Sequence, residues 1–386
     1  MPLMRAGSWR TSERMRKNAN NHGEHVEPSV RVHGGSRTFF NSVASVVLFF
    51  IFGLASCYTP PPPFDEAQWL ESVKAEDTYN LYAPHENPDG TFFVPWMQRP
   101  ERKGTWRSKD KKAFDEFSRE KYAYVPNDYS YLADKNFDSI SFAGHASTII
   151  KMDGETVFTD PFFSNYALIV PKQVKLKFDF SKVPDRPVVL LSHNHYDHLD
   201  KSTIKKMIRK NAVFLVPLKL KDYLVSLGAK EVYELDWWKT MKVGNLSYTF
   251  LPAQHWSRRI GQASGATLWG GWLVRGSKTV YFSGDSGYFR GFEEIGNRFD
   301  IDYAILGAGA NEPRWFMHYS HMNVEEFFRA ADDLKAKIAI PMHFGVISLS
   351  DEPILYPLYE IDQYLAAHPE YSGRIRPLRV GQYLKM

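Results

Sequence analysis

The sequence predicts an α/β protein in which two mixed β-sheets pack face to face and carry helices on their outer faces, an αββα sandwich. From about residue 136, short apolar strands and turns replace an irregular stretch rich in aromatic residues and proline. Strands dominate the first half of this region, and strands alternate with helices in the second half. That mixture fits two sheets with outer helices better than one parallel, doubly wound sheet.

The expected elements follow one another in chain order. Residues 139–160 are predicted to form two strands joined by Asp153-Gly154, a pair that favours a type I′ hairpin. A buried strand over 186–193, a helix over 201–210, a strand over 212–217 and a helix over 222–229 that ends at Gly228 come next. Further strands are expected within 239–255, 270–288, 302–310 and 337–344. The helix over 323–336 begins with a capping pattern, Asn323 to Glu326, whose acidic first turn suits the helix dipole.

The N-terminal residues differ from the remainder in charge. Residues 1–56 contain seven Lys/Arg and three Asp/Glu, which accounts for the whole net charge of +4, and the rest of the chain has 41 of each sign. A neutral body gives little basis for nucleic-acid binding, because phosphate recognition needs a concentrated basic surface. We therefore expect no nucleic-acid partner.

Cys57 is the only cysteine, which excludes an intramolecular disulfide and a cysteine-rich zinc site. It follows a basic leader and the apolar stretch 42–56, and Leu54 to Cys57 resembles the lipobox of bacterial lipoproteins. The resemblance implies a cleaved leader over 1–57 and lipidation of Cys57 in the bacterial cell envelope. The prolines at 60–63 then suit a stiff spacer. A single-span signal anchor over 39–58 and a cytoplasmic chain with a buried cysteine are the alternatives.

The sequence divides into three regions: the leader 1–57, a Pro-rich linker and extension over 58–135 packed on the main domain, and the main domain over 136–386. Within the extension, residues 90–104 are expected to be extended and residues 108–121 to form a short helix.

The motif HNHYDH follows the predicted strand 186–193 and places three histidines and an aspartate within six residues. Alternate residues of an extended segment point the same way, so His193 and His195 can share one metal ion. Asp197 and His198, where the chain turns into the next helix, can then reach a second ion. Imidazole and carboxylate ligands without thiolate suit Zn²⁺, with Fe or Mn as alternatives.

Three more candidate ligands, His255, Asp285 and His343, each follow an apolar strand and precede a loop, where a rigid scaffold presents chemical groups. Seven ligands fit a two-metal site with three histidines on one ion, one bridging aspartate, and Asp197, His198 and a histidine on the other. Metal ions about 3.5–4 Å apart can hold a bridging hydroxide and brace both oxygens of an in-line displacement. The sequence thus predicts a hydrolytic site.

This H-x-H-x-D-H motif, followed by single His, Asp and His residues at strand ends, resembles the metallo-β-lactamase superfamily and implies its fold over residues 136–386. The strings GHAS, TDPFFS, SHNHYDHLD, QHWS, GDSGY, EPRWFM and PMHFG together resemble the family of phospholipases D that hydrolyse N-acylphosphatidylethanolamine. That resemblance implies a zinc phosphodiesterase that releases an N-acylethanolamine and leaves phosphatidic acid.

The resemblance also assigns roles to residues. It implies His193, His195 and His255 on one zinc, Asp197, His198 and His343 on the other, and Asp285 bridging the two. His321 matches a family histidine near the substrate, where it would orient the phosphate or protonate the leaving alkoxide. Asp197, Asp285 and His321 are therefore the expected catalytic residues. His145 and Asp160 are expected to support the ligands rather than bind metal, and His318 and His368 to lie on the surface.

Tryptophans are frequent in the half of the chain that carries the predicted ligands. Most of them, Trp237, Trp238, Trp269 and Trp272, are expected to pack in the core. Trp256, Trp315, Phe316 and Met317 are expected to wall an apolar channel for acyl chains beside His321. The expected partners are a phospholipid substrate and a membrane surface; the sequence leaves open whether the protein forms a homodimer. The alternatives are a lactonase or phosphodiesterase acting on small soluble substrates, and a non-enzymatic envelope protein that binds or stores metal.

Overall fold

The computed structural model describes residues 63–100, 121–122, 124–174 and 177–386. The predicted leader with its lipidation site at Cys57, and all but the last residue of the predicted helix over 108–121, lie outside these ranges. Within them, each helix is too short or too polar to cross a membrane.

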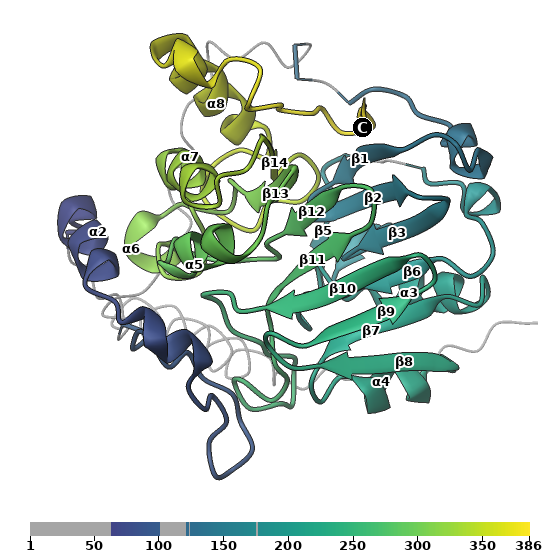
Figure 1. Cartoon of the computed structure of the whole chain (residues 1–386), viewed down its shortest axis with the longest axis horizontal. Coiled ribbons are helices and arrows are strands. Elements are labelled where there is room, and N and C mark those ends of the chain that lie inside the picture. The colour runs from purple at the N-terminus through teal and green to yellow at the C-terminus, as the bar shows by residue number, and fades with distance from the viewer. Residues whose placement is uncertain (1–62, 101–120, 123, 175–176) are drawn as a thin grey trace, which may run out of the picture. The chain divides into compact units, whose positions relative to one another are not determined.

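Two mixed sheets form the centre of the described domain (Figure 1). Within the described residues, the first sheet has the strand order β15-β1-β2-β3-β6-β7-β8 and the second the order β14-β13-β12-β11-β10-β9. The first contains β1 (Ser139–Gly144), β2 (Ser147–Met152), β3 (Glu155–Thr159), β6 (Val188–Leu190), β7 (Val213–Pro217), β8 (Glu231–Leu235) and β15 (Tyr383–Lys385). The second contains β9 (Thr240–Val243), β10 (Leu246–Leu251), β11 (Gly271–Arg275), β12 (Thr279–Phe282), β13 (Tyr303–Gly307) and β14 (Ile338–Met342). The short strands β4 (Tyr166–Ala167) and β5 (Val170–Pro171) pair in a separate hairpin.

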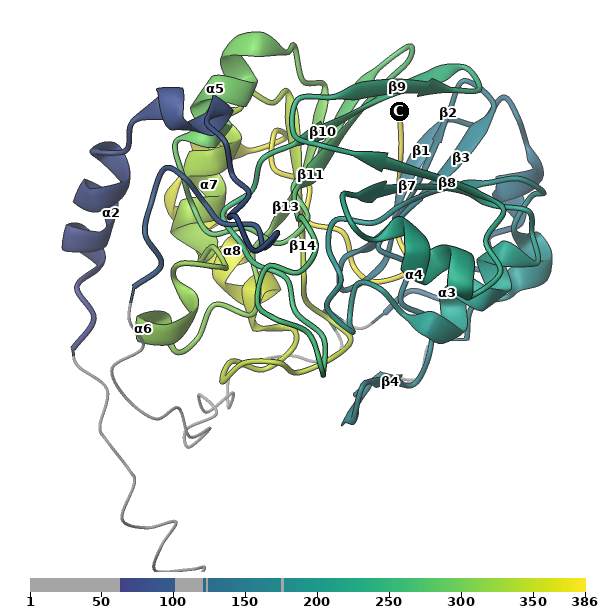
Figure 2. The same cartoon turned by 90° about the horizontal axis from the view of Figure 1, so that it is seen from below.

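Helices cover both outer faces of the pair of sheets. The α-helices are α2 (Glu66–Lys74), α3 (Lys201–Ile208), α4 (Lys221–Ser226), α5 (Gly291–Arg298), α6 (Arg314–Met317), α7 (Val324–Asp333) and α8 (Tyr356–Ala367). The 3₁₀ helices are η1 (Thr78–Tyr82), η2 (Ser130–Ala133), η3 (Phe180–Lys182) and η4 (Pro369–Tyr371). Figure 2 shows α3 and α4 on one side of the sheets and α5, α7 and α8 on the other. The predicted αββα sandwich is therefore confirmed.

The alternation of apolar residues along single strands explains this layering. In β6 and the residue after it, Val188 and Leu190 belong to the core between the sheets, whereas Val189 and Leu191 belong to the cluster beneath α3 and α4. Successive side chains of a strand point to opposite faces, so one apolar run contributes to both layers. The capping box predicted for α7 is also confirmed, because the Asn323 side chain accepts from the backbone of Glu326 and the reverse bond is present.

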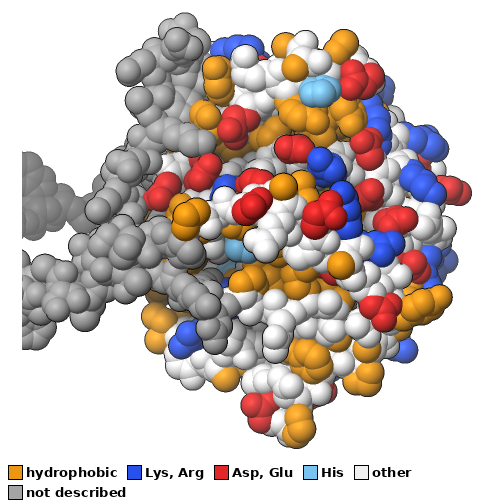
Figure 3. Space-filling view, turned by 90° about the vertical axis from the view of Figure 1, so that its left-hand side faces the viewer, with side chains coloured by type: hydrophobic (Ala, Val, Ile, Leu, Met, Phe, Trp, Pro, Cys, Tyr) orange, Lys and Arg blue, Asp and Glu red, His pale blue; other side chains and the backbone are white. Residues whose placement is uncertain are grey.

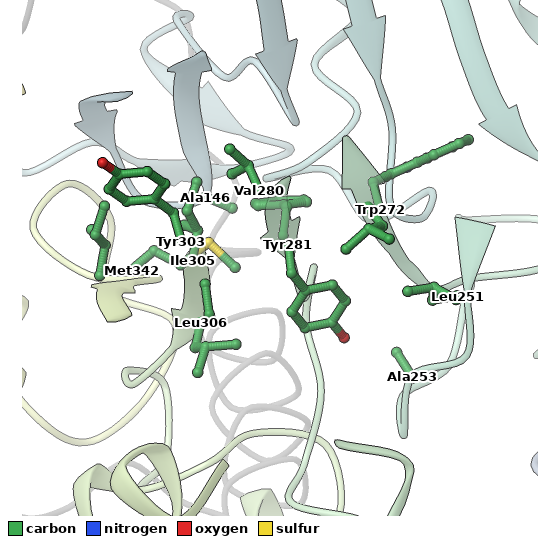
Figure 4. Packing of buried hydrophobic residues seen from close by; sticks show 14 of the residues in the cluster. Ala146, Leu251, Ala253, Trp272, Val280, Tyr281, Tyr303, Ile305, Leu306 and Met342 are labelled. Carbon is green, nitrogen blue, oxygen red and sulfur yellow. The ribbon is translucent and has the colours of Figure 1, made fainter. Parts of the chain in front are cut away.

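Figure 4 shows part of the core between the sheets, with Trp272, Val280 and Ile305 contributed by the second sheet. The indole Nε1 of Trp272 donates to the carbonyl oxygen of Leu191 over 2.9 Å, so the polar atom of this fully buried ring has a partner. Trp237 and Trp269 are buried as well, and Trp238 packs partly buried against the same cluster, which confirms the prediction for these tryptophans.

The prediction for residues 139–160 was wrong in one respect. The first expected strand is two strands, β1 and β2, which pair antiparallel and turn at His145. The break has a tertiary cause: His145 adopts a left-handed φ of 57°, and its amide donates to the carbonyl of Phe344 over 2.9 Å. The hairpin at Asp153-Gly154 is confirmed, because both residues have the positive φ that a type I′ turn needs.

The extension before residue 136 contacts the main domain through polar and apolar groups. Trp69 of α2 donates from Nε1 to Glu326 of α7 over 2.9 Å. Arg314 forms ion pairs with Glu66 over 2.7 Å and with Glu326 over 2.8 Å. The extension also adds side chains to the central core, namely Leu81, Phe92 and Trp96.

His318 was expected at the surface, and that prediction was wrong. Its ring is buried beside Phe64 and Trp69, with centroid separations of 4.4 and 4.6 Å. Because burial disfavours the charged imidazole, the pKa of His318 falls to about 4.

Charges of both signs are interspersed on the side of the domain that carries α2 and α6 (Figure 3).

Replacing Glu76 by glutamine is expected to stabilise the protein at neutral and alkaline pH. Glu76 is buried, one of its carboxylate oxygens has no hydrogen-bond partner among the described residues, and burial raises its pKa to about 8. The folded state therefore keeps a proton that the unfolded state loses above about pH 4.5, so stability falls as pH rises between these two values. Glutamine has the shape of the protonated acid and removes this loss, about 2–4 kcal/mol above pH 8.

Urea unfolding of the two proteins between pH 5 and 9 checks this expectation. The stability difference should be small at pH 5 and largest at pH 9. A difference that does not change with pH would contradict the assignment.

Candidate metal centre

The predicted ligands meet at one edge of the two sheets, where strands end. His193 and Asp285 lie three residues beyond β6 and β12, His343 directly follows β14, and His255 lies four residues beyond β10. His145, in the turn between β1 and β2, ties the two sheets together here: its carbonyl accepts from the amide of His343 over 2.9 Å. Strand ends fixed by backbone hydrogen bonds give the side chains a rigid frame.

Three histidine nitrogens converge on one point. His193 Nε2 lies 2.8 Å from His195 Nδ1, and His255 Nε2 lies 3.3 Å from the same atom. One ligand atom from each of these residues lies within 4.8 Å of the others. This is the donor set predicted for the first metal ion.

A second group joins the two other residues of the motif to the end of β14. Asp197 Oδ2 lies 3.3 Å from His198 Nε2 and 3.7 Å from His343 Nε2, and the two histidine nitrogens are 3.3 Å apart. His145 also belongs to this group, because its Nε2 lies 2.8 Å from Asp197 Oδ2. The structure therefore brings a fourth potential donor to the set predicted for the second ion.

Asp285 lies between the two groups. Its Oδ2 is 3.0 Å from His198 Nε2 and its Oδ1 is 3.1 Å from His343 Nε2. The same Oδ2 is 3.8 Å from His193 Nε2 and 3.7 Å from His255 Nε2. One carboxylate thus reaches nitrogens of both groups, as the bridging position requires.

The hydrogen bonds on the outer side of the histidines orient their ligand atoms. His198 Nδ1 donates to Asp160 over 2.7 Å, His255 Nδ1 to the Ser320 carbonyl over 3.1 Å, and His343 Nδ1 to the Gly309 carbonyl over 3.4 Å. A proton on Nδ1 leaves the lone pair on Nε2, the atom that faces the cluster, and such partners are typical of metal-binding histidines. Asp160, expected to support the ligands, also accepts from the backbone and hydroxyl of Ser192.

The ionisation of the cluster suits a cation. Burial lowers the pKa of His193 and of His255 well below the usual range, so both rings are neutral and able to donate a lone pair. Burial also opposes a charge on His198, but Asp285, Asp197 and Asp160 outweigh it and raise the pKa of His198 well above the usual range. The proton on His198 neutralises part of the negative charge of these carboxylates. A bound metal ion would neutralise the same charge, so the residues present fit a metal centre.

A cavity of about 140 Å³ opens onto this cluster. Five predicted ligands line it, together with His321 and a largely apolar wall. The predicted ligands on its surface are His195, Asp197, His255, Asp285 and His343, and the wall is formed by Trp256, Ala310, Phe316, Met317, Ser320 and Leu349.

His321, expected near the substrate, faces this cavity with its ring centroid 5.3 Å from that of His255 and 5.2 Å from that of His343. Burial lowers the pKa of His321 to about 3, so the ring is neutral at pH 7. Three of the four predicted channel residues, Trp256, Phe316 and Met317, line the cavity. Trp315 is absent from its lining and packs against Phe316 instead.

Arg99 is a part of the site that the sequence did not predict. Its guanidinium lies 4.6 Å from the ring centroid of Trp256, whose other contacts include His195 at 4.5 Å. The arginine therefore holds a wall residue of the cavity from the side of the extension. Arg99 lies within the segment 90–104, which is predicted to be extended, and no spacing within the sequence joins it to a residue 157 positions away. Leu349, which lines the cavity, was not predicted for the same reason.

The fold and the His/Asp groups together define the class: the chain belongs to the metallo-β-lactamase superfamily and is a metal-dependent hydrolase of that fold. Residues 155–344 match the family model described as a β-lactamase superfamily domain. An uncharacterised protein of Mycobacterium tuberculosis is 32% identical over 261 residues, which cover 64% of this chain and 69% of that protein.

Two named relatives carry a more specific description. N-acyl-phosphatidylethanolamine-hydrolyzing phospholipase D of Saccharomyces cerevisiae, a mitochondrial protein, is 30% identical over 236 residues, which cover 58% of this chain and 50% of the yeast protein. N-acyl-phosphatidylethanolamine-hydrolyzing phospholipase D 1 of Caenorhabditis elegans is 30% identical over 244 residues, 58% of this chain and 66% of that protein. The chain thus spans half of one relative and just under two thirds of the other.

Solved structures agree on the fold. A possible metal-dependent hydrolase from Veillonella parvula superposes with a TM-score of 0.53 at 15% identity and covers 65% of this chain and all of its own. A diiron β-hydroxylase from Streptomyces venezuelae superposes with a TM-score of 0.50 at 22% identity, over 68% of this chain and 55% of its own.

Proposed function

We propose that this protein is a dinuclear zinc phosphodiesterase of phospholipase D type, which hydrolyses N-acylphosphatidylethanolamine-type phospholipids to N-acylethanolamine and phosphatidic acid. The observation that carries the proposal is the position of Asp285, whose two oxygens lie 3.0–3.8 Å from histidine nitrogens of both ligand groups. A carboxylate shared between two donor sets suits a pair of ions, and such pairs serve the displacement of phosphate esters.

Two zinc ions would be held by His193, His195 and His255 and by Asp197, His198 and His343. When bound, such a pair lowers the pKa of water and neutralises charge on a phosphate. The reaction forms a bond between a water oxygen and phosphorus and breaks the bond from phosphorus to the ethanolamine oxygen, which takes up a proton. His321, neutral and facing the cavity, would orient the phosphate by donating a hydrogen bond to one of its oxygens. Trp256, Phe316 and Met317 would exclude bulk water beside it.

The named relatives support the substrate class, since two of them are described as hydrolysing N-acylphosphatidylethanolamine. The location proposed from the sequence, a lipid anchor at Cys57 in a bacterial envelope, stays a prediction on residues outside the described ranges.

Lipid profiling by mass spectrometry tests the proposed substrate. The full-length protein, loaded with zinc, is incubated with a membrane lipid extract that contains N-acylphosphatidylethanolamines. We expect phosphatidic acid and N-acylethanolamine to appear in equal amounts as the parent lipid disappears, and a chelator to stop both. An unchanged lipid profile together with hydrolysis of a lactone or of a small soluble diester would instead support the alternative activity.

A further inference from the structure

The turn of the β4–β5 hairpin has an unusual composition. Ala167 pairs with Val170, so only Leu168 and Ile169 connect the two strands. Two-residue hairpin turns favour Asn-Gly or a similar pair, because their backbone requires positive φ. Here Leu168 adopts a φ of 55°, and residues Leu168 and Ile169 are 48% and 81% exposed.

The turn therefore combines two unfavourable features that packing does not offset. A leucine in the left-handed region is strained, whereas glycine or asparagine would not be. Exposed leucine and isoleucine side chains also leave apolar surface in water. Neither side chain belongs to the apolar cluster at the base of the hairpin, which contains Phe162, Ala167 and Ile347. A role that takes these side chains out of water would explain why leucine, and not glycine or asparagine, occupies the strained position. It would also explain why two apolar side chains are exposed.

The hairpin is fixed beside the mouth of the metal-centre cavity. At its base, the amide of Gln173 donates to the carbonyl of Val346 over 2.8 Å, and Lys172 forms a β-bridge with Ile347. The same apolar cluster contacts Leu349, which lines the cavity, and Tyr196, which stands between two predicted ligands in the motif. Figure 2 shows β4 projecting from the body of the domain.

A second exposed apolar side chain is tied to the same point. Ile260 is 75% exposed, and its amide donates to the hydroxyl of Tyr196 over 3.2 Å. The guanidinium of Arg259 lies 3.9 Å from the centroid of the Tyr196 ring. The hairpin turn and the loop at Ile260 are thus both anchored to Tyr196. Two exposed basic residues, Lys177 and Arg258, follow the hairpin and precede Ile260 in sequence.

The size of the cavity adds a further constraint. Pockets that enclose a drug-sized ligand have volumes of about 300–1,000 Å³, whereas this cavity has about 140 Å³. It suits a phosphate and its immediate neighbours, and it is too small for the acyl-chain channel that was expected from Trp256, Phe316 and Met317. The chains must then remain in an apolar phase outside the cavity while the phosphate reaches the metal centre.

We propose that Leu168, Ile169 and Ile260 form an interfacial anchor that inserts into a lipid bilayer and seats the mouth of the cavity on its surface. Lys177 and Arg258, which are exposed and lie near these apolar residues in sequence, suit a bilayer that contains anionic lipids. The proposal rests on the proposed function for its purpose, but its test does not depend on turnover.

Depth-dependent fluorescence tests the insertion directly. In a full-length C57S background, Ile169→Cys carries an environment-sensitive nitrobenzoxadiazole label, and vesicles contain equal amounts of phosphatidylcholine and phosphatidylglycerol. We expect the label to brighten severalfold on mixing and to be quenched by spin labels placed on the acyl chains. Tyr79→Cys, at an equally exposed position in η1 (84%), is the matched control and should show neither change.

A double variant, Leu168→Gly with Ile169→Ser, places glycine at the position of positive φ and should fold normally. We expect it to lose hydrolysis of N-acylphosphatidylethanolamine in vesicles through a raised KM, with hydrolysis of bis(p-nitrophenyl) phosphate unchanged. A label at position 169 that is not quenched by the spin-labelled lipids overturns the anchor. If the label instead becomes buried only as the protein concentration rises, the apolar turn contacts a second copy of the chain, and the anchor is also overturned. Quenching without any phospholipid hydrolysis would retain the anchor and reject the proposed function.

Discussion

Replacing Asp285 by asparagine is expected to lower turnover by about 10³-fold or more. The carboxylate lies within 3.0–3.8 Å of nitrogens from both donor groups, so its charge would be shared by two cations. Asparagine keeps the shape of the side chain but removes the negative charge, and one of its ends becomes a donor that cannot bind a metal ion. Both ions would lose their shared ligand at once.

Steady-state hydrolysis and thermal unfolding of the variant check this expectation. Asp300→Asn, at an exposed position before β13, is the matched control and should keep full activity. The variant at 285 should remain folded, because its backbone and neighbours are unchanged. A folded Asp285→Asn protein with wild-type turnover would rule out the bridging assignment.

Two single variants, each lacking one histidine of one donor group, are each expected to lose the metal ion of that group only. His255→Ala leaves His193 and His195 in the first group, and His343→Asn leaves Asp197 and His198, with His145 beside them, in the second. Asparagine is chosen at 343 because this residue has a φ of 70°, which asparagine adopts more readily than alanine. We expect about two metal ions per chain in the wild type and about one in each variant, with turnover reduced by about 10²-fold or more.

Elemental analysis of the dialysed proteins provides the count. His368→Ala is the control, since the side chain of His368 is 42% exposed and pairs with Glu370. Two ions retained in both variants, or a single ion in the wild type, would contradict the two-group arrangement.

The candidate ligands could be proposed from the sequence because each follows an apolar strand, and part of the set is local in the chain. His193 and His195 are alternate residues after an apolar strand, and the structure brings their nitrogens to 2.8 Å from each other. Asp285 and His343 could be found because each also follows an apolar strand, and parallel strands end at the same edge of a sheet. The layers of the fold were predictable for a similar reason, since alternation along β6 and β7 divides apolar side chains between two faces.

The features that escaped prediction depend on partners far away in the chain. The turn at His145 forms because Phe344 accepts its amide hydrogen bond, and no local pattern marks it. Arg99 meets Trp256 only after the extension has packed on the domain. The exposure of Leu168 and Ile169 could not be read from the string ALIV, which resembles an ordinary buried strand.

Hydrolysis in ¹⁸O-labelled water tests the central claim most directly. The zinc-loaded full-length protein acts on vesicles that contain N-acylphosphatidylethanolamine, and mass spectrometry locates the label in the products. The proposed displacement at phosphorus predicts one ¹⁸O atom in the phosphatidic acid and none in the N-acylethanolamine. Label in a released fatty acid, or diacylglycerol formed in place of phosphatidic acid, would contradict a phosphodiesterase of phospholipase D type.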